Sequence, residues 1–314
     1  MGGLCLGFDT SNYTTSAAVF DGEMGENRGR LLTVPEGALG LRQSDAVFQH
    51  VRRLHLMVEQ LRQDGLLGSL AAVGASTKPR ETEDSYMPCF LVGEGQGRTL
   101  AAALGVPFFP CSHQQGHIAA AAWSAGRSDL LDTPHLAWHL SGGTTELLYV
   151  RPEGCSVRAR VIGGTSDISA GQLVDRIGVA LGLQFPAGRA LDELACAAES
   201  AENGRYRVEL HDGRFSLSGM ENKIKGMLER GCSSGEAARF AFETIAWVLI
   251  RATEQARAQY GDIPVLCSGG VASSRLLRRR LAPLGAVFAP PRYSTDNALG
   301  VAILTRRALE QGEA

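Results

Sequence analysis

The sequence predicts an α/β protein built from two similar halves. Two segments share a pattern of apolar strand, small polar turn, paired threonines and second strand, and Thr144 follows Thr14 by 130 residues (144 − 14). Between these segments, helical and strand patterns alternate. At 314 residues the chain is long enough for two domains. Its apolar content of 44% and charged content of 20% are ordinary for a globular protein.

The repeated segments, residues 4–20 and 135–150, each predict a β-hairpin. Chance similarity of two hairpins is the competing explanation. A duplicated half that opens with a hairpin is the layout of actin-like (ASKHA), sugar-kinase-like nucleotide-binding proteins. We therefore predict two α/β domains, residues 1–130 and 131–314, with a nucleotide and metal cleft between them. The last helix is expected to pack back on the N-terminal half.

The other elements follow from apolar spacing and from turn residues. Helices are predicted over 45–63, 93–104, 117–123, 170–181, 192–202, 235–260, 272–284 and 295–311, and strands over 71–76 and 264–268. Residues 102–110 predict the end of a helix, a turn and a short strand. Residues 129–133 resemble a linker, and residues 184–190 a Pro/Gly turn.

His113 and His117 form the most informative short motif. Side chains four residues apart on a helix share one face, so both imidazoles can bind one metal ion. The pair is expected where a strand passes into a helix, which is a common place for a site in an α/β protein. The motif lacks the Glu of the zincin HExxH, so one core histidine and one solvated histidine is the alternative interpretation.

Asp296 stands before the last predicted helix, among Ser294, Thr295 and Asn297. Helix capping explains such a residue well. It is also a candidate third ligand, because two histidines and one carboxylate with open positions suit a catalytic Fe²⁺ or Zn²⁺.

Three loops have the composition of anion-binding turns. They contain Asp9 and Ser11 in the first hairpin, Ser141, Gly142, Gly143 and Thr144 in the second, and Gly269 and Gly270 before the helix at 272. Glycine lets backbone amides approach a phosphate, and hydroxyls add donors. Asp175 and Asp192 are candidate ribose contacts. Taken alone, each loop is explained equally well by a structural turn, and a lone Asp is explained better as a structural residue on a helix.

The bulk composition narrows the class of protein. A net charge of −2 argues against a strongly basic protein that wraps nucleic acid, and leaves a local basic groove open. The seven cysteines are scattered and form no CxxC pair, so reduced thiols are expected. No apolar run reaches the roughly 18 residues of a membrane span, and we expect a cytoplasmic protein without a membrane role.

Eight segments in order resemble the tRNA N6-threonylcarbamoyladenosine synthase family (TsaD, formerly glycoprotease), over nearly the whole chain. They are residues 7–11, 113–118, 140–145, 170–176, 185–188, 215–219, 268–272 and 295–298. The resemblance implies an actin-like fold. It also implies transfer of a threonylcarbamoyl group from threonylcarbamoyl-AMP to N6 of the adenosine adjacent to the tRNA anticodon, with protein partners of that system.

Residue by residue, the resemblance implies that His113, His117 and Asp296 bind one Fe²⁺ or Zn²⁺ ion. It assigns contacts with the adenine nucleotide (threonylcarbamoyl-AMP, or ATP or AMP) to Leu140, Ser141, Gly142, Gly143, Thr144, Asp175, Gly188, Asp192 and Ser274. The chain departs from the family pattern at several positions. Thr144 stands for a usual His, Gln172 for Glu, Ser274 for Asn, and Tyr13-Thr14 for Asp-Glu. The usual motifs are also absent from residues 37–50 and 78–88.

Three functions remain in view at this point. The first is a metal-dependent threonylcarbamoyl transferase acting on tRNA. The second is a catalytically impaired nucleotide-binding paralogue with a regulatory or partner role. The third is a metallopeptidase, which is disfavoured because Gln114 and Gln115 cannot act as a base beside the histidines. Arg275, Arg278, Arg279 and Arg280 are candidate contacts for tRNA phosphates, although a solvated helix face explains them more simply.

Overall fold

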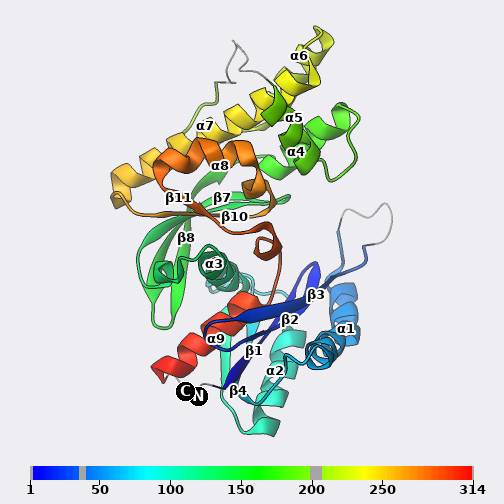
Figure 1. Cartoon of the computed structure of the whole chain (residues 1–314), viewed down its shortest axis with the longest axis vertical. Helices are drawn as coiled ribbons and strands as arrows, with labels where there is room; N and C mark the ends of the chain where they lie inside the picture. Colours follow the sequence, from blue (N-terminus) through cyan, green and yellow to red (C-terminus); the bar gives the residue numbers. More distant parts are fainter. Residues whose placement is uncertain (1–2, 35–39, 199–206, 313–314) are drawn as a thin grey trace. The chain divides into compact units, whose positions relative to one another are not determined.

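The computed structural model describes residues 3–34, 40–198 and 207–312. These form two compact units (Figure 1). The first unit comprises residues 1–132, 151–159 and 295–314, and the second residues 133–150 and 160–294.

The first unit contains a five-stranded sheet in the order β3-β2-β1-β4-β5. Its strands are β1 (Leu4–Ser11), β2 (Thr14–Phe20), β3 (Gly25–Leu31), β4 (Leu70–Lys78) and β5 (Phe108–Ser112). β1 pairs antiparallel with β2 and parallel with β4, and β4 pairs parallel with β5. The helices are α1 (Gln43–Gln63), α2 (Phe90–Leu104), α3 (His113–Ser124) and α9 (Leu299–Gln311), with a 3₁₀ turn η1 (Ser128–Leu131).

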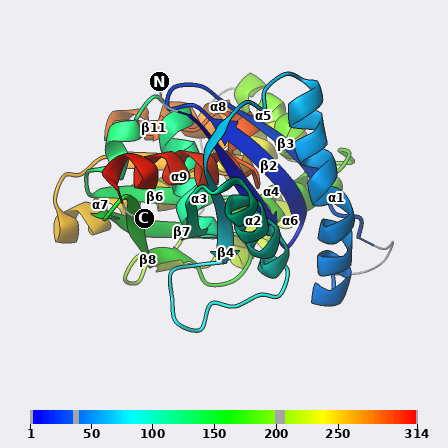
Figure 2. The same cartoon turned by 90° about the horizontal axis from the view of Figure 1, so that it is seen from below.

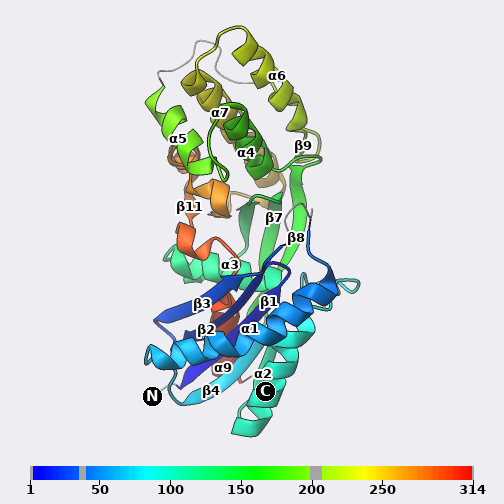
Figure 3. The ribbon, with the colours of Figure 1, turned by 90° about the vertical axis from the view of Figure 1, so that its right-hand side faces the viewer.

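The two faces of this sheet are covered by different helices because side chains alternate along each strand. Leu6 and Phe8 of β1 pack with Leu54 of α1 and Val92 of α2. Gly7, on the opposite face, lies against the backbone of α9. In Figure 3, α1 lies in front of the strands and α9 behind them. Figure 2 shows α3 next to α9.

The second unit contains a six-stranded sheet in the order β11-β10-β6-β7-β8-β9. Its strands are β6 (His135–Leu140), β7 (Thr145–Glu153), β8 (Ser156–Thr165), β9 (Arg214–Phe215), β10 (Val265–Ser268) and β11 (Ala286–Phe288). The helices are α4 (Ala170–Ala180), α5 (Gly188–Ala197), α6 (Ser218–Glu229), α7 (Ser234–Tyr260) and α8 (Arg275–Leu281). Short 3₁₀ turns are η2 (Gly270–Ser273), η3 (Ala282–Leu284) and η4 (Pro291–Tyr293). The core is centred on α7 and β6, where buried Trp138 donates a hydrogen bond to Thr253 Oγ1 at 2.9 Å.

The two sheets repeat one topology, which confirms the predicted duplicated α/β fold. β6 pairs antiparallel with β7 and parallel with β10, as β1 does with β2 and β4. β11 then extends the sheet beside β10, as β5 does beside β4. Both predicted hairpins are therefore present.

Several elements differ from the sequence-based prediction. β3, β8, α6 and β11 were not predicted; β3, for example, is a polar edge strand without an apolar run. The linker predicted at 129–133 overlaps η1, and the helix predicted over 272–284 is η2, α8 and η3 in succession. α5 begins within the predicted turn, at Gly188, and ends at Ala197; positions 199–202 of the predicted helix lie outside the described residues. No helix in the described parts of the chain is long and apolar enough to cross a membrane.

Candidate metal centre and nucleotide loops

The start of α3 is fixed by a capping box, which places His113 at its first position. The Ser112 hydroxyl accepts a hydrogen bond from the backbone N–H of Gln115, and the Gln115 side chain accepts one from the N–H of Ser112. The Gln115 amide also donates to the carbonyl of Val157 at 2.8 Å. With the helix anchored in this way, His113 and His117 lie on one face one turn apart.

Asp296 reaches these histidines because α9 packs very closely against α3. A Cβ added to Gly300 of α9 would lie 2.5 Å from the carbonyl carbon of Gly116 and closer still to its oxygen. Only glycine permits this approach of the two backbones. Gly7 of β1 allows a similarly close approach, since its Cβ would lie 2.5 Å from the backbone N of Ala302. The predicted helix from 295 begins instead at Leu299, so Asp296 lies in the preceding loop.

Three side chains converge on a single point. His117 Nε2 lies 2.9 Å from His113 Nε2 and 3.2 Å from Asp296 Oδ1, and His113 Nε2 lies 3.6 Å from the same carboxylate oxygen. All three ligand atoms lie within 4.8 Å of one another. Two imidazole nitrogens and one carboxylate oxygen form a donor set that suits Zn²⁺ or Fe²⁺ and leaves coordination positions open. The residues present therefore fit the metal that the family resemblance implies.

Asp9 lies beside His113. One carboxylate oxygen of Asp9 lies 2.6 Å from His113 Nδ1, and the other accepts the backbone N–H of Ser11 at 2.8 Å. Thr14 donates its hydroxyl to Asp296 Oδ2 at 3.4 Å. Asp9 and Ser11, predicted as nucleotide contacts, are thus placed in the first unit around the metal ligands.

The charges of this cluster stabilise one another. Burial disfavours a charged His113, but the carboxylates of Asp9 and Asp296 outweigh it and raise the pKa of His113 to about 10. Burial also opposes ionisation of Asp296, yet the hydrogen bonds from His113 and His117 hold its pKa well below the usual range. Without a metal ion, His113 is therefore protonated on both ring nitrogens, including Nε2, the atom that would bind the ion.

The loop over residues 141–144 forms a tight turn in the second unit. Ser141 N–H donates to the Thr144 carbonyl at 2.8 Å, and Thr144 N–H donates to Ser141 Oγ at 3.0 Å. A Cβ on Gly142 or Gly143 would meet nothing within 4 Å, so their backbone is open to a ligand. The N-terminus of α4 packs on this loop at Gly171, whose Cβ would lie 2.5 Å from Gly142 Cα.

The glycine loop after β10 lies against the end of β6 in the same unit. Gly269 has φ +94°, and its Cβ would clash with the backbone of Leu140. Only glycine adopts this conformation readily. Gly270 faces open space.

The two predicted ribose contacts, Asp175 and Asp192, accept hydrogen bonds from other residues of the second unit. Asp175 accepts the backbone N–H of Ala187 at 2.8 Å, next to Gly188. Asp192 is buried and accepts from the Ser274 hydroxyl at 2.5 Å and from the N–H groups of Arg275 and Leu276. It therefore binds the first backbone N–H groups of α8. These contacts favour the structural interpretation of Asp192.

The arginines of α8 are also used within this unit. Arg280 pairs with Glu243, at 2.7 Å between Nε and Oε2, and Arg278 donates to the carbonyls of Ala272 and Ala289. Arg279 donates to Cys196 Sγ at 3.3 Å. These contacts give the basic helix a structural role within the unit, in place of the fully solvated face that the sequence suggested.

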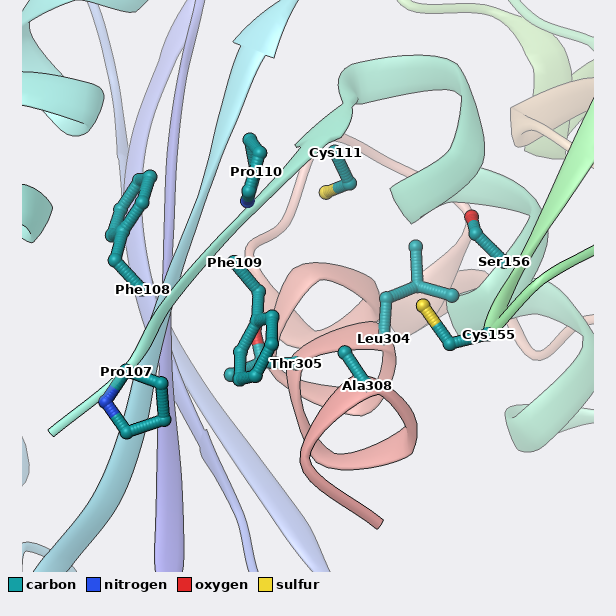
Figure 4. A pocket seen from close by; sticks show the side chains of 10 residues that line it. All are labelled: Pro107, Phe108, Phe109, Pro110, Cys111, Cys155, Ser156, Leu304, Thr305 and Ala308. Carbon is teal, nitrogen blue, oxygen red and sulfur yellow. The ribbon is translucent and has the colours of Figure 1, made fainter. Parts of the chain in front are cut away.

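A cavity of about 480 Å³ lies elsewhere in the first unit, between β5, α9 and residues 155–156. Figure 4 shows Phe109, Cys111, Cys155 and Leu304 around it. The three metal-ligand candidates are not among its lining residues. All seven cysteines lie in described segments, and each is a free thiol.

Solved structures define the class of fold. The structure is similar to full-length HypF in its phosphate- and nucleotide-bound form, with a TM-score of 0.63 at 14% identity, over 98% of this chain and 56% of that one. It is also similar to a ROK family glucokinase from Streptomyces griseus, with a TM-score of 0.52 at 13% identity, over 97% of this chain and all of the other. These likenesses show that the fold is the duplicated actin-like (ASKHA) fold.

Sequence comparisons place the chain within that class. The family model of tRNA N6-adenosine threonylcarbamoyltransferase matches residues 46–303. The curated enzyme of that name from Thermus thermophilus is 33% identical over 98% of this chain and 93% of its own length. That from Geobacillus kaustophilus is 32% identical over 84% of this chain and 78% of its own. The chain belongs to the tRNA N6-adenosine threonylcarbamoyltransferase family, as its motifs predicted.

The sequence interpretation missed the contacts that surround the metal ligands. Thr14 entered the prediction as part of the repeated hairpin and as a departure from the family pattern, and Asp9 was assigned to the nucleotide. The sequence did contain one signal for Asp9: residues 7 and 9 of a strand share one face, so Asp9 is expected on the same side of the sheet as Gly7. No local signal links Asp9 to His113, 104 residues further along the chain, or Thr14 to Asp296, 282 residues further along.

Proposed function

We propose that this protein transfers a threonylcarbamoyl group from threonylcarbamoyl-AMP to N6 of the adenosine adjacent to the anticodon of tRNA. We further propose that one Fe²⁺ or Zn²⁺ ion, held by His113, His117 and Asp296, is required. Membership in a family of tRNA threonylcarbamoyltransferases supports the reaction. The convergence of two Nε2 atoms and one carboxylate oxygen within 4.8 Å carries the metal dependence.

The residues of the first unit prepare this chemistry. His113 and His117 present nitrogen lone pairs, and Asp296 contributes a negative charge that favours a cation between them. A divalent ion bound there supplies a Lewis acid that polarises a substrate oxygen and orients the group to be transferred. Because the protein provides three ligands, substrate oxygens can take the remaining positions.

The loops of the second unit suit the adenylate. Gly142 and Gly143 leave open space beside their backbone and lie next to the N-terminus of α4. Backbone N–H groups there would stabilise the negative charge on the phosphate of the departing AMP. Gly269 and Gly270 offer a second open stretch of backbone. In this proposal Leu140, Ser141, Thr144, Asp175, Gly188 and Ser274 shape these loops around the nucleotide.

The departures from the family pattern have local replacements. Gln172 completes a capping box with Ser169, a role that Glu or Gln can fill. Ser274 caps α8 through the N–H of Leu277 at 3.1 Å. Thr14 donates to Asp296. These three departures therefore keep a defined contact, which supports an active transferase. We infer that the enzyme acts on tRNA in the cytoplasm together with protein partners.

Reconstitution tests the proposal. The protein is incubated with threonine, bicarbonate, ATP, the enzyme that makes threonylcarbamoyl-AMP, partner proteins and unmodified tRNA. The tRNA is then digested, and its nucleosides are analysed by mass spectrometry. We expect threonylcarbamoyladenosine from the wild type and none from His117→Ala. His211→Ala removes an exposed imidazole in the second unit and serves as the matched control.

The outcomes separate the rival functions. No modified nucleoside from the wild type, together with retained binding of AMP, would refute the transferase and favour the impaired nucleotide-binding paralogue. Full activity in metal-free protein would refute the metal requirement alone. Metal content of wild type and His117→Ala, measured by elemental analysis, gives an independent readout.

A further inference from the structure

The carboxylate of Asp9 is buried and has a defined partner for each oxygen. The residue is 1% exposed. Oδ1 accepts the backbone N–H of Ser11 at 2.8 Å, and Oδ2 lies 2.6 Å from Nδ1 of His113. A buried carboxylate is costly unless its oxygens are hydrogen-bonded, so these two contacts account for its presence.

The strand fixes where this carboxylate points. Gly7 and Asp9 lie on the face of β1 that is directed towards α3 and α9, while Leu6 and Phe8 face the opposite core. Asp9 is paired with Ser16 of the neighbouring strand β2, which holds the backbone in register. The carboxylate is thus carried by a strand that pairs on both sides in the sheet rather than by a loop.

The contact with Asp9 determines which nitrogen of His113 is available. A carboxylate accepts hydrogen bonds, so Nδ1 carries a proton and its N–H donates a hydrogen bond to Asp9 Oδ2. Nε2 then faces His117 Nε2 and Asp296 Oδ1, at 2.9 and 3.6 Å. A carboxylate that accepts the second N–H of a metal-binding histidine fixes its ring and strengthens it as a ligand.

We infer that Asp9 is a positioning residue for the metal centre, acting through His113 rather than on the nucleotide. The inference rests on the proposed metal-dependent function. With only 1% of Asp9 exposed, its carboxylate presents almost no surface to a nucleotide. Asp9 therefore completes a carboxylate–histidine–metal arrangement.

The test measures metal affinity in Asp9→Asn by competition for Zn²⁺ against a chromophoric chelator. An amide has one acceptor oxygen and cannot satisfy both Ser11 N–H and His113 Nδ1–H. We expect affinity to fall by about 10- to 100-fold, the usual effect of losing such a partner. Asp167→Asn makes the same chemical change in the second unit and should leave affinity unchanged.

A double-mutant comparison shows whether Asp9 acts through the histidine. In a His113→Ala background, Asp9→Asn should weaken Zn²⁺ binding by less than twofold further. An equal loss in both backgrounds would overturn the inference, as would wild-type affinity in Asp9→Asn alone. Circular dichroism of the metal-free proteins checks that each variant is folded.

A measurement on the wild type does not depend on any variant. Long-range ¹H–¹⁵N NMR of the Zn²⁺-loaded protein should show His113 protonated at Nδ1 and bound through Nε2. The opposite tautomer would overturn the inference. A wild type that binds no metal would overturn both the metal centre and this role. A wild type that binds metal, with Asp9→Asn equally tight, would overturn this role alone.

Discussion

Gly300→Ala tests whether close packing of α3 and α9 builds the metal centre. The new Cβ would lie 2.5 Å from the carbonyl carbon and 2.9 Å from the Cα of Gly116, where real Cβ contacts essentially never fall below 3.0 Å. The opposing atoms are backbone, which cannot rotate away. The two helices must therefore separate by at least 0.5 Å (3.0 − 2.5), and by more to clear the Gly116 oxygen.

The expected cost follows from two opposing effects. Overpacking a core costs about 1–3 kcal/mol, and a backbone clash belongs at the upper end. Alanine in a helix regains about 1 kcal/mol relative to glycine. We expect a net loss of about 2 kcal/mol in the free energy of unfolding, which lowers Tm by roughly 4–8 °C.

The same displacement should weaken the metal centre. Asp296 precedes α9 and the histidines lie on α3. Separation of the helices therefore increases the distance between the carboxylate and the imidazoles. A metal–ligand distance can depart from its ideal value by only about 0.2 Å. We expect Zn²⁺ affinity to fall at least tenfold by chelator competition, alongside the loss in Tm measured by calorimetry.

Gly95→Ala is the matched control. Gly95 lies within α2, and a Cβ there would meet nothing within 4 Å. This variant should gain roughly 0.5–1 kcal/mol and keep wild-type metal affinity. If Gly300→Ala matched Gly95→Ala in both Tm and metal affinity, the packing argument would be refuted.

Three further predictions concern single hydrogen bonds and charges. Thr14→Val removes the hydroxyl that donates to Asp296 and should weaken Zn²⁺ binding about threefold, while Thr14→Ser retains it; equal affinity in Val and Ser would contradict this role. Because neighbouring carboxylates outweigh burial and raise the pKa of His113 to about 10, the metal must displace a proton below that pH. The apparent affinity should rise about tenfold per unit between pH 6 and 8, and a flat profile corrected for the chelator would exclude this competition. Burial raises the pKa of Asp167, but hydrogen bonds from the Ser216 and Ser218 hydroxyls, and from the N–H groups of Leu217 and Ser218 at the start of α6, outweigh it and lower the pKa. Its stabilisation is present at neutral pH and is lost as pH falls below the unfolded pKa near 3.8, so Asp167→Asn should cost about 1 kcal/mol in urea unfolding at pH 7, with the difference shrinking towards pH 3.

Local patterns predicted the fold well where the hydrophobic signal was strong. The hairpins, α1 and α7 follow from apolar periodicity, because a face that packs on a core must repeat with its element. β3 and α6 escaped prediction because their stability comes from partners elsewhere. β3 pairs along β2, and Asp167 binds the N–H groups that begin α6.

The candidate metal ligands could be predicted from the sequence, but the residues that contact them could not. The spacing of His113 and His117 on one helix determines that they can share a metal ion, and the ordered motifs predicted the family. Assigning Asp9 to a nucleotide relied on loop composition alone. That assignment missed His113 because the two are 104 residues apart in sequence.

The sequence by itself determined the duplicated α/β architecture, the family and the three candidate ligands, since each depends on residue type, order and local spacing. Only the tertiary structure decided that Asp9 and Thr14 contact those ligands and that Asp192 binds the N-terminus of α8. The physical reason is distance along the chain: these contacts exist because strands pair in register and because glycines let helix backbones meet.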